Sequence, residues 1–198
     1  YLATATHELA LAGELDPEET MEIMNGAFEF LITPITKNEG TLARLMGDAI
    51  LAFFGAPIAH EDDPVRAVRA ALEIIAGAQD YAHKLETERG ICGFNVRVGI
   101  NTGLVVVGEM GSDLRVEYTA MGDAINLAAR MEQNAPVGSV MISNDTYQQT
   151  QGAFDMEALE PILVKGKDEP VKVYRVLKAK ARSFRRAATR WWGARRLR

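Results

Sequence analysis

Hydrophobic residues recur at helical spacing along much of this chain, and two long segments carry the pattern most clearly. One begins at Leu15-Asp16-Pro17 and the other at Asp62-Asp63-Pro64. An aspartate can cap a helix, and proline is well tolerated in its first turn. The first apolar stripe closes near Asn38-Glu39-Gly40, and the second continues to about Lys84. The pattern therefore predicts two long helices.

Elsewhere the pattern shortens to the period of strands. Strands are predicted at 41–46, 49–54, 94–100, 104–108, 140–142 and 171–177. Gly47-Asp48 is typical of a tight turn between the first two. A third helix is predicted from Met121-Gly122-Asp123 to just before Pro136, and Asn144 starts a short fourth helix.

The order of these elements predicts an α+β fold. A strand at Leu2–Thr6, the one remaining candidate, would complete a ferredoxin-like split βαβ sheet with the helices packed on one face. We assign residues 1–177 to one domain and residues 178–198 to a basic linker or tail.

Composition narrows the class of protein. Hydrophobic residues make up 47% and charged residues 25%, as in ordinary soluble domains. No apolar run approaches the roughly 20 residues needed for a transmembrane segment. The single Cys92 excludes an internal disulfide framework and suits a reducing compartment, so we expect a cytoplasmic location. The chain has no start methionine and no signal-peptide pattern, so we expect a fragment of a longer protein.

Charge is divided sharply along the chain. Nine of the 22 Lys and Arg residues lie from Lys178 onward, and all 27 Asp and Glu residues lie before it. Residues 1–177 therefore carry about −14 and the last 21 residues +9. An acidic body of this kind is a poor nucleic-acid binder. The tail, with Trp191 and Trp192, is either a linker or a segment that touches lipid or nucleic acid.

Four polar residues are candidates for chemistry. Asp48, in the predicted turn, would present a fixed carboxylate to a hard cation, although a plain turn aspartate has the same pattern. Asn126 and Arg130 lie one helical turn apart, so they share a face that is either solvated or grips a phosphate or sugar oxygen. Lys165, in Val164-Lys165-Gly166-Lys167, would suit a polyphosphate or an ordinary surface turn. Three histidines and one cysteine form no zinc-type pattern.

In combination these motifs resemble the catalytic domain of class III adenylyl and guanylyl cyclases, with the bacterial adenylyl type as the nearest layout. The resemblance runs in order from about residue 10 to residue 177. The matching stretches are 15–19, 44–49, 53–57, 60–63, 97–103, 118–130 and 164–167.

The resemblance implies a head-to-tail dimer whose active sites are each shared by two chains and turn ATP into cyclic AMP and pyrophosphate in intracellular signalling. Asp48 would be the second of two aspartates that hold two Mg²⁺ or Mn²⁺ ions. Asn126 would position the ribose, Arg130 would stabilise the transition state, and Lys165 would hold the terminal phosphates. Arg44 and Thr119 stand at the two positions that choose the purine. Arg44 replaces the usual lysine of adenylyl cyclases and is not the glutamate of guanylyl cyclases, so adenine is favoured.

The start of the chain departs from the family. Counting back without a gap puts Thr4 at the first metal aspartate, and a hydroxyl is a poor bridge between two divalent ions. Glu8 and Glu14 are nearby carboxylates, but neither is at the expected position. Three hypotheses therefore stay open. The chain is a cyclase, a catalytically impaired cyclase-like domain that binds nucleotide or dimerises to regulate a partner, or half of a heterodimer whose partner supplies the aspartates.

Overall fold

The computed structural model describes residues 2–9, 16–46, 49–110, 117–121, 123–164 and 169–181. Its elements follow in the order β1 (Leu2–Leu9), α1 (Pro17–Lys37), β2 (Thr41–Met46), β3 (Ala49–Phe53), α2 (Asp63–Arg89), β4 (Phe94–Asn101), β5 (Val106–Met110), β6 (Glu117–Met121), α3 (Asp123–Asn134), β7 (Val140–Ser143), α4 (Asn144–Thr150), β8 (Phe154–Ala158) and β9 (Val173–Ala179). The predicted α+β class is confirmed.

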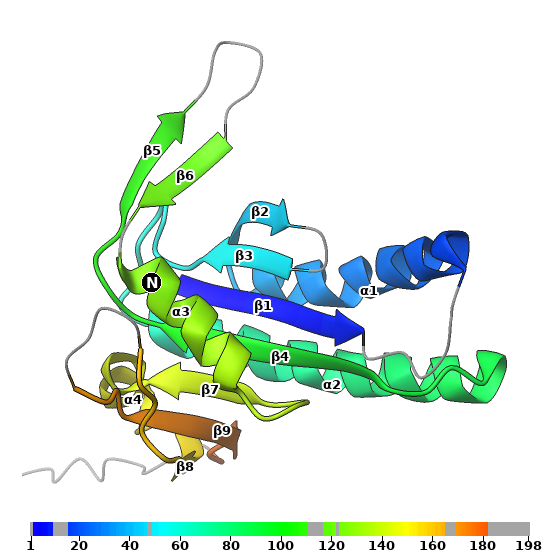
Figure 1. Cartoon of the computed structure of the whole chain (residues 1–198). Coiled ribbons are helices and arrows are strands. Elements are labelled where there is room, and N and C mark those ends of the chain that lie inside the picture. Colours follow the sequence, from blue (N-terminus) through cyan, green and yellow to red (C-terminus); the bar gives the residue numbers. More distant parts are fainter. Residues whose placement is uncertain are drawn as a thin grey trace, which may run out of the picture.

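Seven strands form one sheet in the order β2-β3-β1-β4-β7-β9-β8. The predicted first strand is confirmed, and β1 lies between β3 and β4, antiparallel to both. The pairing of β4 with β7 is parallel. Strands β5 and β6 form a separate two-stranded ribbon, which projects away from the main sheet beside α3 (Figure 1).

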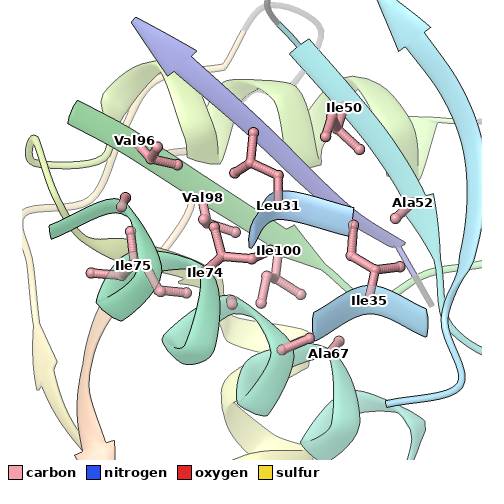
Figure 2. Close-up of a cluster of buried hydrophobic side chains, with 14 of the residues drawn as sticks. Leu31, Ile35, Ile50, Ala52, Ala67, Ile74, Ile75, Val96, Val98 and Ile100 are labelled. Carbon is pink, nitrogen blue, oxygen red and sulfur yellow. The ribbon is translucent and has the colours of Figure 1, made fainter. Parts of the chain in front are cut away.

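Helices α1 and α2 cover one face of this sheet. Asp16 accepts a hydrogen bond from the backbone N–H of Glu18 at 3.3 Å, so the predicted cap starts α1. Both helices bury their apolar stripes against the same side of β3 and β4 (Figure 2). The largest contributors that Figure 2 labels are Leu31, Ile35, Ile50, Ile74, Ile75, Val96, Val98 and Ile100.

Helix α3 lies on the opposite face. The expectation of helices on one face therefore holds for α1, α2 and α4, whose Tyr147 packs against the same cluster, and is wrong for α3. Leu127 and Met131 of α3 pack against Met141 of β7 and Val173 of β9. In Figure 1, α3 crosses the near side of β1 and β4, with α1 and α2 behind them. The apolar residues of β4 alternate onto the face that α1 and α2 cover, so the sequence indicated only that face as buried. The other face carries Gly99, and the backbone of α3 covers the sheet there.

Two strands were not predicted. The segments of β6 and β8 are five residues each. In β8, Asp155 and Glu157 alternate with three apolar residues, so this segment does carry the period of a strand, and that signal was missed. Strand β9 continues to Ala179, beyond the predicted domain boundary at 177, and residues 182–198 lie outside the described part of the chain. Among the residues described, no helix combines the length and apolarity that crossing a bilayer requires.

Candidate functional site

The exposed face of α3 carries the predicted pair of Asn126 and Arg130. Both side chains are exposed, whereas Leu127 and Ala128 between them are buried against the sheet. Arg130 Nη1 donates to Gln133 Oε1 at 2.7 Å, and the Arg130 carbonyl accepts from Asn134 Nδ2 at 2.8 Å. Each contact is local to the helix. The prediction that both residues share one accessible helix face is therefore confirmed, while their roles stay predictions.

Glycines in β4 and the loop after it let α3 approach closely. A Cβ atom at Gly99 would lie 2.2 Å from the backbone nitrogen of Glu132 and 2.4 Å from the carbonyl oxygen of Ala128. A Cβ atom at Gly103 would lie 2.8 Å from the Cβ atom of Ala124. These glycines, which the sequence analysis named only within the matching stretch 97–103, thus form the surface on which the helix of Asn126 rests.

Asn101 was not identified from the sequence as part of the site. It is the last residue of β4, and only 2% of its surface is exposed. Its Nδ2 donates to the carbonyl of Ala124 in the first turn of α3 at 3.0 Å, and its Oδ1 accepts from Ser143 Oγ at 2.6 Å. A polar residue directly after the apolar run Val98-Gly99-Ile100 was the available signal.

The two positions expected to select the purine lie on neighbouring strands. Arg44 is an exposed residue of β2, and Thr119 pairs with Gly108 in the ribbon of β6 and β5. Strand β2 contacts β6 although Arg44 and Thr119 are 75 positions apart in the sequence, so the fold brings distant segments together. The side chain of Thr119 lies outside the described part of the structure.

Asp48 and Lys165 both lie outside the described residues. The strands that flank Asp48 pair at Met46 and Ala49, as a hairpin requires. Val164, immediately before Lys165, is buried in the apolar cluster that includes Leu127 and Met131 of α3. The residue before Lys165 therefore packs in the same cluster as the buried face of α3, the helix that carries Arg130.

The register of β1 bears on the missing carboxylate. Thr4 pairs with Leu51 of β3 and Gly99 of β4, whereas Thr6 pairs with Ala49, the residue that follows Asp48. The strand position beside the hairpin is thus Thr6, two residues beyond the position found by counting along the sequence. Neither is a carboxylate.

The described residues offer few carboxylates to a metal site near β1. The one carboxylate of β1, Glu8, pairs with Asn95 toward the end of that strand. Within the described ranges, no three His, Cys, Asp or Glu residues gather where they could hold a metal ion. The described residues therefore do not by themselves supply the ligands of a two-ion site.

The motif at 60–63 proves to hold the loop before α2. Asp63 is fully buried and accepts from the backbone N–H of His60 at 2.7 Å and faces His60 Nδ1 at 3.2 Å. Arg66 binds Asp62 Oδ1 through its Nε at 2.7 Å and also binds Glu39. The Arg66 guanidinium holds the pKa of Asp62 below its usual range. These charges join α2 to the turn after α1.

Comparison with known proteins gives one consistent result. The family model described as "Adenylate and Guanylate cyclase catalytic domain" matches residues 6–178. Adenylate cyclase 1 of Rhizobium meliloti is 30% identical over 163 residues, which are 81% of this chain and 24% of that protein. The chain thus spans about a quarter of the length of that relative.

Solved structures agree with this match. The adenylyl cyclase CyaB from P. aeruginosa superposes with a TM-score of 0.82 at 27% identity, covering 90% of this chain and 94% of that one. The guanylyl cyclase Cya2 superposes with a TM-score of 0.81 at 29% identity, covering 92% of this chain and 93% of that one. Similarity to both an adenylyl and a guanylyl cyclase fixes the fold and leaves the purine open.

Proposed function

Because this chain belongs to the class III adenylate and guanylate cyclase catalytic domain family, we propose that it converts ATP into cyclic AMP and pyrophosphate in intracellular signalling. The observation that carries the proposal is the pair on α3. Asn126 and Arg130 are both exposed on one face of a helix whose other face is seated closely on the sheet. A rigid seat with two accessible polar groups is what stabilisation of a developing charge needs.

The reaction determines what these groups would do. The 3′-oxygen of the ribose forms a bond to the α-phosphorus, the bond from that phosphorus to the bridging oxygen breaks, and pyrophosphate leaves. The 3′-hydroxyl proton is released. Charge on the phosphates spreads during this in-line displacement, so cations and positioning matter more than covalent help. Arg130 would neutralise that charge, Asn126 would orient the ribose, and Lys165 would hold the terminal phosphates.

We further propose that two chains share each active site. The hydrogen bonds of Arg130 described above stay within its own helix, and both Asn126 and Arg130 face outward. A second copy that brings Asp48 to this face would complete the site and make a homodimer with two equivalent sites. In a heterodimer, a different cyclase chain would bring the aspartates.

The proposed purine is adenine. Arg44 on β2 and Thr119 on β6, which contacts β2, would face the base. Arg44 offers hydrogen-bond donors at the position where guanylyl cyclases carry a glutamate. Guanine is the alternative, since Arg44 differs from lysine in reach.

A divalent cation, Mg²⁺ or Mn²⁺, is part of the proposal, and two ions are expected from the resemblance. Asp48 is the residue of this chain that would hold it. When bound, such an ion neutralises phosphate charge. We also propose a cytoplasmic location, where ATP is available.

A second candidate function rests on β1. The strand has a hydroxyl at both positions where an aspartate is expected, Thr4 by sequence and Thr6 by sheet register. A cyclase-like domain that binds nucleotide or dimerises without turnover would fit that loss.

The test is cyclic AMP formation by the purified chain with ATP and Mn²⁺. The proposed function predicts product well above that of an Asp48→Ala control. Product no higher than that control would contradict it, and nucleotide binding without product would support the second candidate. The same assay with GTP distinguishes the two purines.

A further inference from the structure

We propose that Asn101 is a positioning residue for the cyclisation reaction, because it holds the first turn of α3 and thereby sets the place of Asn126 and Arg130. This inference rests on the proposed function. It concerns a residue that does not itself reach the substrate.

The contacts of Asn101 tie three elements together. From the end of β4, its Nδ2 donates to the Ala124 carbonyl at 3.0 Å. Its Oδ1 accepts from Ser143 Oγ at 2.6 Å, at the junction of β7 and α4. Ser143 also lies 3.3 Å from Thr146 Oγ1, which lies 3.0 Å from Thr102 Oγ1. The buried amide is therefore fixed at both ends.

The bond to Ala124 is additional to the bonds of the helix. The Ala124 carbonyl lies in the first turn of α3, where the helix itself offers the backbone N–H of Ala128 as a donor. A carbonyl has a second lone pair, and Asn101 uses it. Loss of the amide would thus leave the helical bonds of α3 in place but would release its first turn from β4.

The geometry places this tether close to the reactive pair. Asn126 follows Ala124 by two residues, which is about 3 Å of rise along the helix axis. The absence of a Cβ atom at Gly99 lets α3 lie close to β4 at Ala128 and Glu132, one to two helical turns after Ala124. Asn101 adds a directional bond at the N-terminal end. The two contacts together fix both the distance and the axial position of the helix.

Two variants test the tether. Asn101→Asp keeps the shape and the acceptor but removes the donor to Ala124, and Asn101→Ala removes the amide without burying a charge. The control is Asn95→Asp on the same strand, because Asn95 Nδ2 donates to the nearby Gly93 carbonyl at 3.2 Å rather than to α3. Two readouts are taken on the full chain, at a temperature at which each variant is folded: backbone hydrogen exchange, and the kcat and KM for ATP.

Positioning predicts that amides of 123–134 exchange about three- to tenfold faster in both variants, while amides of α1 and α2 keep their rates. It also predicts a fall in kcat of about 10- to 100-fold with KM within about threefold, because a misplacement near 1 Å is costly to reaction. The control should change neither.

Unchanged exchange in α3 would overturn the inference whatever the activity. Faster exchange with unchanged kcat would also overturn it, since the helix would then be loosened without consequence. If the wild-type chain forms no cyclic nucleotide, the proposed function fails, and the exchange readout still decides whether Asn101 holds α3.

Discussion

The close approach of α3 to Gly99 gives the sharpest prediction. Replacing Gly99 with alanine adds a single methyl group where β4 meets α3. That methyl carbon would lie 2.2 Å from Glu132 N, 2.4 Å from Ala128 O and 2.8 Å from Glu132 Cα. Favourable separations between such atoms begin near 3.5 Å. All three neighbours belong to the helix backbone, which cannot swing aside as a side chain can. Helix α3 must therefore move away from the sheet by about 1 Å.

The expected cost follows from that displacement. Overpacking of a well-packed interior costs about 1–3 kcal/mol of the free energy of unfolding. For a domain of this size that lowers Tm by about 2–12 °C. A shift of about 1 Å in α3 also displaces Asn126 and Arg130, so the rate of cyclic AMP formation should fall by about 100-fold.

The assay compares Gly99→Ala with Gly152→Ala. A Cβ atom at Gly152 would meet nothing within 4 Å, so the same chemical change there should alter the free energy of unfolding by less than about 0.5 kcal/mol. Thermal unfolding followed by circular dichroism gives Tm, and product formation at a temperature well below it gives the rate. Equal Tm and equal rate for the two variants would refute the account of how α3 is seated.

Three further predictions concern the rest of the site and the fold. Thr4→Asp and Thr6→Asp test which position of β1 should carry the metal-binding carboxylate. The sheet register predicts that Thr6→Asp raises Mn²⁺-dependent product at least about tenfold more than Thr4→Asp, since the two positions lie about 7 Å apart. A larger gain from Thr4→Asp would favour the position found by counting along the sequence. Arg44→Glu should lower kcat/KM for ATP by about tenfold or more because a carboxylate cannot donate to adenine, and unchanged ATP kinetics would exclude Arg44 from base recognition. Burial raises the pKa of Tyr81 above its ordinary value of about 10, so above that pH the folded chain keeps a proton that the unfolded chain releases, and the free energy of unfolding should fall as pH rises. Tyr81→Phe should remove the part of this fall that Tyr81 causes. Identical alkaline profiles of denaturant unfolding for the wild type and the variant would contradict this prediction.

Local signals in the sequence predicted the parts of the fold that local physics decides. Asp16 and Pro17 start α1 as their capping chemistry requires, and the alternation of Val96, Val98 and Ile100 marks β4 and its buried face. These features depend on neighbours a few residues away.

Features that depend on distant partners were not predicted. The segment of β6 is only five residues long, and it is a strand because it pairs with β5. Gly99 lies against the backbone of Glu132, and this contact joins two segments that are distant in the sequence. The shared face of Asn126 and Arg130 follows from helical spacing, whereas Asn101 joins the site through Ala124, 23 residues away.

In the proposed dimer, one chain supplies Asn126 and Arg130 to an active site whose Asp48 comes from the other chain. The most direct test mixes two inactive variants, Asp48→Ala and Arg130→Ala, and measures cyclic AMP from ATP with Mn²⁺. Random pairing makes half of the dimers mixed, each with one intact site, so the mixture should recover about a quarter of the wild-type specific activity. A mixture as inactive as its two components, beside an active wild type, would contradict the shared site.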